Sequence, residues 1–142
     1  MRLLIGSDSG YAALIRAANE FHEADSRSPL LVLFGSDSAF PFKPRPSTIL
    51  VPGMPAGVIA AIPALEEFGI ASRLASPLGL PGCYDGPVTE LADAWLRATD
   101  PATREGLHLA VSGPDSTISA TEDLARRFGL TVTVIPAQET SA

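Results

Sequence analysis

Two short stretches of this chain place glycines next to hydroxyl and carboxylate side chains in the same order. Residues 6–9 read Gly-Ser-Asp-Ser and are followed by Gly10, and residues 35–38 repeat the same four letters. Glycines keep a turn small enough for a phosphate to approach the backbone, and free N–H groups and hydroxyls can donate hydrogen bonds to it. The first stretch is therefore a candidate phosphate-binding turn.

The first turn also has a purely structural interpretation. An ionised carboxylate at Asp8 repels a phosphate unless it points away or caps the next helix. The dinucleotide-binding pattern G-x-G-x-x-G also contains a middle glycine that residues 6–10 lack. Nucleotide binding and an ordinary strand-to-helix connection, capped by Asp8 or Ser9, both fit the turn itself. The four-letter match with residues 35–38 is too short to indicate a duplication.

Both turns follow apolar runs that read as strands of a buried parallel sheet. The predicted strands are residues 3–5, 30–34, 48–51, 70–74, 107–111 and 130–135. A third turn, residues 112–114, follows the fifth of these runs. Because the carboxyl ends of parallel strands share one edge of a sheet, we expect the three turns along that edge, where one ligand can touch each of them.

Apolar residues at helical spacing separate the strands. The predicted helical segments are residues 11–21, 56–68 (interrupted at Pro63), 88–96 and 118–128, the last capped by Asp115 or Ser116. Strands that alternate with helices predict an α/β fold, a three-layer doubly wound parallel sheet of Rossmann-like type. We expect residues 1–136 to form this domain and residues 137–142 to be a loose tail.

Two longer connections are predicted to be loops rather than helices. Residues 39–46 contain three prolines, and we expect Phe40 and Phe42 to pin this loop to the core. Residues 76–86 are rich in glycine and proline, as is typical of a loop over a site.

Composition excludes several functional classes. Ten basic and sixteen acidic residues give a formal net charge of −6, and the basic residues do not cluster, so nucleic acid and anionic membrane surfaces are not expected partners. No apolar stretch is long enough for a membrane span, which predicts a cytoplasmic protein. With one cysteine, Cys83, and two histidines, no metal site is expected. Cys83 has no neighbouring His or Lys and is expected to be an unreactive thiol.

Three stretches, in order, resemble the C-terminal NAD(P)-binding domain of the ferredoxin-NADP reductase superfamily, which includes flavin reductases and the electron-transfer subunit of dihydroorotate dehydrogenase. Residues 4–10 are similar to that family's strand and glycine-rich turn for the pyrophosphate. Residues 86–91, Gly-Pro-Val-Thr-Glu-Leu, resemble its helix start of glycine, any residue, valine, threonine, acidic residue and leucine. Residues 111–114, Val-Ser-Gly-Pro, resemble its cysteine-glycine-proline turn beside the nicotinamide.

The resemblance implies the nucleotide-binding part of an NAD(P)H-dependent flavin oxidoreductase. NAD(H) or NADP(H) would pass a hydride to a flavin held on a separate flavin-binding domain or subunit, because nothing in this chain resembles the family's flavin domain. Such a chain would be an incomplete enzyme without that partner. A single cysteine excludes the iron–sulfur cluster that some relatives carry.

For a bound NAD(P)H, we expect the backbone of Gly6, Ser9 and Gly10 to face the pyrophosphate, with the hydroxyls of Ser7 and Ser9 as donors. Asp37 is expected to accept a hydrogen bond from the adenosine 2′-hydroxyl and to repel a 2′-phosphate, which favours NAD over NADP. Lys43 and Arg45 in the next loop can reverse that preference, and an Asx turn is the structural alternative for Asp37.

The resemblance places Ser112, Gly113 and Pro114 beside the nicotinamide, with Ser112 in the position of the family's catalytic cysteine. Their structural alternative is a strand-to-helix turn. Thr89 is a further candidate cofactor ligand, and its alternative is an ordinary first-turn helix residue.

A different functional class also fits the sequence. Residues 7–9 replace the glycine-rich centre of the family's first turn, and Ser112 replaces its cysteine. These departures are compatible with a non-catalytic interaction module that retains the fold without the cofactor.

Overall fold

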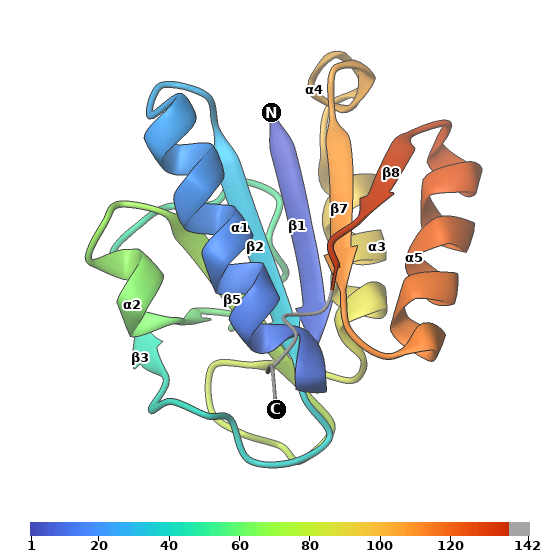
Figure 1. The fold of residues 1–142 in the computed structure, drawn as a ribbon. Helices are drawn as coiled ribbons and strands as arrows, with labels where there is room; N and C mark the ends of the chain where they lie inside the picture. The colour runs from blue at the N-terminus through green and yellow to red at the C-terminus, as the bar shows by residue number, and fades with distance from the viewer. Residues whose placement is uncertain (137–142) are drawn as a thin grey trace, which may run out of the picture.

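The chain forms a six-stranded parallel sheet between two layers of helices in a computed structural model that describes residues 1–136 (Figure 1). The strands of this sheet are β1 (Arg2–Ser7), β2 (Leu30–Gly35), β5 (Ala71–Ser76), β6 (Tyr84–Asp85), β7 (His108–Ser112) and β8 (Thr131–Val134). Their order is β6-β5-β2-β1-β7-β8, and every neighbouring pair is parallel. The predicted doubly wound α/β fold is confirmed.

Helices cover both faces of the sheet. They are α1 (Tyr11–Ala24), α2 (Pro63–Glu66), α3 (Val88–Ala98), α4 (Pro101–Glu105) and α5 (Asp115–Phe128). The helices α1 and α2 pack on one face, whereas α3 and α5 pack on the other. The chain runs outward from β1 in one direction through β2 and β5, and in the other through β7 and β8. The strand order therefore reverses between β1 and β7, which is the switch point where ligands bind in open α/β sheets.

The continuous apolar run of β1 follows from burial on both faces. Leu3 and Ile5 lie in the apolar cluster beneath α3 and α5, and Leu4 lies in the cluster beneath α1. All three side chains are fully buried, and each such burial contributes about 1.5–3 kcal/mol to stability. Gly129, in the left-handed conformation at φ +66°, ends α5 as expected.

One predicted strand and one predicted helix differ from the structure, and the predicted loop 76–86 contains the short strand β6. The predicted strand at residues 48–51 is an irregular loop in which the Thr48 N–H and hydroxyl both donate to the Glu66 carboxylate, and the Ile49 carbonyl accepts from Arg73. Leu50 is 87% exposed. Residues 48–51 are apolar enough for a strand, but β5 occupies the place beside β2 in the sheet. The side chains of Glu66 and Arg73 therefore supply the hydrogen bonds to the loop backbone that a neighbouring strand would have made.

The predicted helix at residues 56–68 was wrong over most of its length. Only α2 is helical there, starting at the predicted interruption, Pro63. Before it, β4 (Ala60–Ala61) pairs antiparallel with β3 (Arg45–Pro46). Pro63 lacks the N–H that a continuing helix needs, and Gly57 has a positive φ of +84°, so both residues limit the helix to its last turn.

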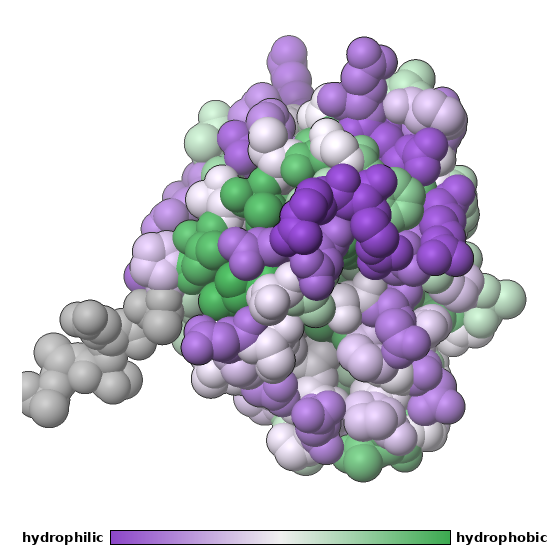
Figure 2. Space-filling model, turned by 90° about the vertical axis from the view of Figure 1, so that its right-hand side faces the viewer, coloured by the Kyte–Doolittle hydropathy of each residue, from purple (hydrophilic) through white to green (hydrophobic). Residues whose placement is uncertain are grey.

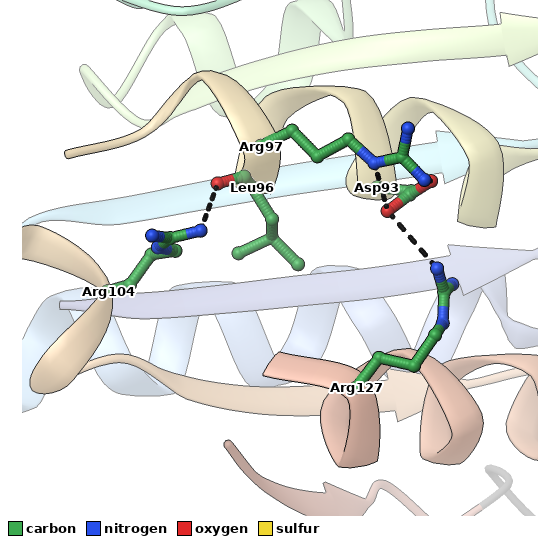
Figure 3. A network of polar contacts seen from close by, with 5 residues as sticks. All are labelled: Asp93, Leu96, Arg97, Arg104 and Arg127. Carbon is green, nitrogen blue, oxygen red and sulfur yellow. Dashed lines mark hydrogen bonds and ion pairs between the residues drawn. The ribbon is translucent and has the colours of Figure 1, made fainter. Parts of the chain in front are cut away.

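The helices α3 and α5 are also linked by charged side chains (Figure 3). Asp93 on α3 pairs with Arg97 at 3.0 Å and with Arg127 of α5 at 3.5 Å, and Arg104 donates to the Leu96 carbonyl near the end of α3. The side of the molecule on which α5 lies is largely hydrophilic (Figure 2). Within residues 1–136, no helix has both the length and the hydrophobicity needed to cross a membrane.

Candidate functional site

The three predicted turns meet at the carboxyl edge of the sheet, the lower edge in Figure 1. Ser7 at the end of β1 pairs with Gly35 at the end of β2, and Gly6 pairs with Ser112 at the end of β7. Parallel strands in register bring these segments side by side, although more than a hundred residues separate the first from the third. The expectation that the turns share an edge is confirmed.

A cleft of about 300 Å³ opens at this edge between the first turns of α3 and α5. This volume is at the lower end of the range for small-molecule sites. The residues that line it come from the ends of β1, β2 and β5 and from the two helices: Ser7, Asp8, Gly35, Ser36, Asp37, Pro77, Gly86, Pro87, Val88, Thr89, Ser116, Thr117 and Ala120. Three predicted ligands, Ser7, Asp37 and Thr89, are among them.

Both helices that flank the cleft direct their N-termini toward it. The N-cap residues are Pro87 for α3 and Pro114 for α5, and a proline side chain cannot cap a helix. The predicted caps of α5, Asp115 and Ser116, lie inside the helix instead. The first backbone N–H groups of each helix are therefore left for an external acceptor, and the helix dipoles favour an anion there.

Gly35 allows α3 to approach the sheet at the cleft. A Cβ atom at this position would lie 2.8 Å from the Cβ of Val88 and 3.3 Å from its backbone nitrogen. The glycine that ends β2 thus positions the first turn of α3 by close packing, which differs from a direct role in binding phosphate.

Asp8 occupies the rim of the cleft in an unusual conformation. Its φ is +49°, and its Oδ1 accepts hydrogen bonds from the Ser36 hydroxyl at 3.1 Å and from the Asp37 N–H at 3.3 Å. The structural alternative in which Asp8 or Ser9 caps α1 is therefore not what the structure has. A 3₁₀ turn, η1 (Asp8–Gly10), precedes the helix, no side chain caps it, and the Asp8 carboxylate is directed to the turn after β2.

Two predicted site serines, the ligand Ser7 and the catalytic candidate Ser112, form hydrogen bonds inside the protein. Ser7 Oγ lies 2.6 Å from Thr117 Oγ1, so it links β1 to α5. Ser112 Oγ donates to the Gly10 carbonyl at 3.1 Å. Both serines are buried, with exposed fractions of 5% and 1%. The Ser7–Thr117 pair lies on the cleft wall, whereas Ser112 is not a lining residue.

The turns after β1 and β7 are in direct contact. A Cβ atom on Gly10 would collide with the Ser112 carbonyl and lie 2.6 Å from the Gly113 nitrogen. A Cβ atom on Gly113, whose φ is +149°, would lie 2.9 Å from the Ser7 carbonyl oxygen. The close approach of these glycines brings the two strand ends together.

Six predicted site residues lie outside the lining of the cleft: Gly6, Ser9, Gly10, Ser112, Gly113 and Pro114. Gly6 packs against Leu14 of α1, on the opposite face of the sheet. Ser9 is exposed in η1. Their cofactor-binding roles stay predictions, as does the catalytic role of Ser112.

Four lining residues with polar side chains, Asp8, Ser36, Ser116 and Thr117, were not predicted as ligands. Asp8 was weighed only as a repulsive charge or a cap, and Ser116 only as a cap. Thr117 follows Pro114 by three residues, and this spacing places it in the first turn of α5 on the side of the cleft. The signal for Ser116 and Thr117 was present in the sequence, since first-turn residues of a helix that follows a strand lie at the carboxyl edge.

The charge of the cleft is negative at one end and uncompensated by basic side chains. Asp8 and Asp37 are the charged residues that line it, and no described lining residue is Lys or Arg. Lys43 and Arg45, which could have favoured a 2′-phosphate, are not in the lining. Within residues 1–136, no three His, Cys, Asp or Glu side chains lie close enough to hold a metal ion.

The loop after β2 is anchored beside the site by aromatic packing. The ring centroid of Phe40 lies 6.0 Å from that of the buried Phe34, and the ring centroid of Phe42 lies 5.3 Å from that of Tyr11. This confirms that Phe40 and Phe42 pin the loop. Burial raises the pKa of Tyr11 and also that of the Cys83 thiol, which favours the protonated form of each.

A second cavity, of about 310 Å³, lies at the amino edge of the sheet. Its lining includes Met1, Pro29, Val51 and Trp95. Ligands of open α/β sheets bind at the carboxyl edge, where the N-termini of α3 and α5 flank the cleft, so we assign the site to that cleft.

Comparison with known proteins gives a likeness of fold. No protein-family model and no curated protein matches the sequence. The structure is similar to a chain of an NADH-dependent reduced ferredoxin-NADP oxidoreductase, solved in a study of flavin-based electron bifurcation, with a TM-score of 0.62 and 18% sequence identity. The match covers 93% of this chain but spans only 38% of that chain. The protein thus has a ferredoxin-NADP reductase-like α/β fold.

Proposed function

We propose that this chain is the nucleotide-binding part of an NAD(P)H-dependent flavin oxidoreductase and that NADH is its nucleotide. The observation that carries the proposal is the cleft between the N-termini of α3 and α5, next to the switch point of a ferredoxin-NADP reductase-like sheet. Two helix N-termini that converge on one cleft favour an anionic ligand there, by about 0.3–1 kcal/mol each.

In this proposal the pyrophosphate lies against the first turns of α3 and α5. The N–H groups of Val88 and Thr89 from one side and of Asp115 and Ser116 from the other are placed to donate to it. The hydroxyls of Thr89 and Thr117 add donors on the walls. Negative lining charge at Asp8 and Asp37 opposes phosphate, so the expected affinity is modest.

The remaining length of a dinucleotide would follow the carboxyl edge toward the turn after β7. The cleft holds only part of such a ligand, because 300 Å³ is small for a dinucleotide. We place the nicotinamide over Ser112, Gly113 and Pro114. Ser112 would then act through its backbone, because its hydroxyl is committed to the Gly10 carbonyl.

The hydride acceptor would be a flavin held by a separate domain or subunit. A flavin supplies the ring that accepts a hydride from the nicotinamide when both are held in contact. The described residues of this chain contribute the nucleotide site, and the similar oxidoreductase chain is much longer than this one. A flavin-binding partner is therefore part of the proposal.

A non-catalytic interaction module is the second candidate. The direct contact between the turns after β1 and β7 favours it, because Gly10 and Gly113 are used for packing instead of for exposing backbone to a ligand. The carboxylates in the cleft also favour it. Under this alternative, the cleft binds no nucleotide and the chain acts through a stable protein partner.

Titration calorimetry with NADH distinguishes the nucleotide-binding function from the non-catalytic module. One variant fills the cleft with a larger side chain, and a control variant places the same side chain outside it. Ala120 lines the cleft on α5, whereas its neighbour Ser119 is exposed and absent from the lining. We expect Ala120→Leu to weaken NADH binding at least tenfold and Ser119→Leu to leave it within twofold. Absence of heat at millimolar NADH with the wild-type chain, or equal effects of both variants, would contradict the proposed site.

A further inference from the structure

The neighbouring turn fixes the carboxylate of Asp8 in one orientation. A single oxygen, Oδ1, accepts both the Ser36 hydroxyl and the Asp37 N–H. No described residue donates to the second oxygen, Oδ2, although Asp8 lines the cleft. One oxygen is thus used to orient the group, and the other is left for a donor in the cleft.

The backbone of Asp8 is held in a conformation that most side chains avoid. A φ of +49° lies in the left-handed region, where Asp and Asn are the best tolerated residues after Gly. Such local strain persists where surrounding contacts determine the conformation. Here those contacts are the hydrogen bonds to the turn after β2, and they keep the carboxylate at the rim of the cleft.

Asp37 differs from Asp8 in this respect. Its side chain is exposed, and within residues 1–136 no hydrogen bond or ion pair fixes its carboxylate. Its contribution is the backbone N–H that it donates to Asp8. Ser36 is also held in place, because its hydroxyl accepts the Ser38 N–H at 3.2 Å. The turn after β2 therefore acts as a support for Asp8.

We infer that Asp8 is the residue that selects the nucleotide, by accepting a ribose hydroxyl at Oδ2 and rejecting a phosphate at the same position. A preorganised carboxylate is a good acceptor for a ribose hydroxyl, and a phosphate there would place like charges in contact. The inference rests on the proposed NADH site and moves the selecting role from Asp37 to Asp8. NADH is accepted, and NADPH, with its additional 2′-phosphate, is rejected.

The competing explanation is a general effect of negative charge at the rim. Both aspartates contribute such a charge, so charge alone predicts that either one can be neutralised with the same result. A fixed acceptor predicts that only Asp8 matters strongly. A fixed acceptor also predicts a weaker preference for NADH when the Ser36 hydroxyl is removed, although the charge of Asp8 is kept.

The test measures the dissociation constants of NADH and NADPH for four proteins: the wild type, Asp8→Asn, Asp37→Asn and Ser36→Ala. Asn tolerates the left-handed conformation, so Asp8→Asn should fold, and circular dichroism and thermal unfolding check this. We expect the wild type to prefer NADH at least tenfold. Asp8→Asn should reduce that preference at least fivefold, Ser36→Ala two- to fivefold and Asp37→Asn less than twofold.

The possible results separate the inference from the function on which it rests. Equal effects of Asp8→Asn and Asp37→Asn, or no effect of Asp8→Asn in a folded protein, would overturn the selecting role of Asp8 while leaving NADH binding intact. If neither nucleotide binds the wild type, the proposed function itself fails, and the inference fails with it.

Discussion

Residues 6–9 and 35–38 have the same four letters and stand at the ends of adjacent strands, yet the chain continues from them in different ways. After β1 the chain enters η1 and then α1 without an intervening loop. After β2 it enters a long connection held by Phe40 and Phe42. One turn presents a fixed carboxylate, and the other supplies the donors that fix it.

The residues that follow each turn account for this difference. Gly10, Tyr11 and Ala12 permit a helix immediately, whereas Pro41, Pro44 and Pro46 prevent one. The register adds a second difference, since Ser7, not Gly6, pairs with Gly35. The two glycines therefore face opposite sides of the sheet, Gly6 toward Leu14 of α1 and Gly35 toward Val88 of α3. The same four-residue sequence thus packs against α1 in one case and against α3 in the other.

The largest effect is expected at the contact between the turns after β1 and β7. Gly10→Ala would drive a Cβ atom into the backbone of Ser112 and Gly113, which cannot move without separating β1 from β7. We expect a loss of about 3 kcal/mol or more in the free energy of unfolding, measured by urea denaturation. Gly106→Ala is the control, because open space surrounds Gly106 and its φ is −99°; its effect should stay within about 1 kcal/mol. A similar stability for both variants would disprove the close contact.

The second prediction compares the loss of stability on replacing Gly35, at the end of β2, with that on replacing Gly6, near the end of β1. Gly35→Ala places a Cβ atom against the Cβ of Val88, which cannot rotate away, and should cost about 2 kcal/mol. Gly6→Ala meets the far end of the Leu14 side chain at 2.7 Å and should cost about 1 kcal/mol. Of the two, only Gly35→Ala should also weaken NADH binding, because it displaces the first turn of α3. Weaker binding in Gly6→Ala alone would reverse this assignment.

The third prediction concerns Glu66, whose carboxylate accepts hydrogen bonds from Ser47 and Thr48. Burial raises the pKa of Glu66, but hydrogen bonds from Thr48 and Ser47 and the charge of Arg73 outweigh it and lower the pKa. A lowered folded-state pKa gives stability that is present above the unfolded value and lost as the pH falls through the folded value. Glu66→Gln should cost about 1 kcal/mol or less at pH 7, because solvent screens part of the interaction.

A pH series checks the sign of this effect. The difference in stability between the wild type and Glu66→Gln should be full near neutral pH and shrink as the pH falls below the ordinary value of 4.5. Glu67→Gln, an exposed neighbour, should show little difference at any pH. A difference that grows in acid would contradict the lowered pKa.

The smallest effect is expected where charged side chains link the helices that flank the cleft. Asp93→Asn removes the pairs with Arg97 and Arg127, whose guanidinium groups are exposed to solvent. We expect the free energy of unfolding to fall by about 0.5 kcal/mol at low salt and by less in 1 M sodium chloride. NADH affinity should be unchanged, since strand-end glycines position the helix N-termini. Weaker binding in this variant would show that the ion pairs position them instead.

Much of the fold was predictable because its signals are local. Apolar runs ended by glycine marked β1 and β2, and helical spacing with Gly129 marked α5. The prediction failed where side chains, rather than a strand, satisfied the backbone, as in residues 48–51. No local pattern indicates that Glu66 and Arg73 bind this loop, because these partners come from later elements.

The site was predictable in position but only partly in composition. The sheet edge followed from the alternation of strands and helices. The use of Gly10 for packing against Ser112, and of Asp8 as a fixed acceptor, depends on contacts between turns that are distant in sequence. Only the folded sheet brings these turns together.

The most direct test of NADH binding between α3 and α5 is a titration of the ¹⁵N-labelled chain, followed by backbone amide shifts. We predict the largest saturable changes at Val88, Thr89, Ser116 and Thr117, with smaller ones at Asp8 and along residues 112–114. The absence of shifts at millimolar NADH, or shifts centred on Trp95 and Val51 at the amino edge, would contradict a nucleotide site at the carboxyl edge.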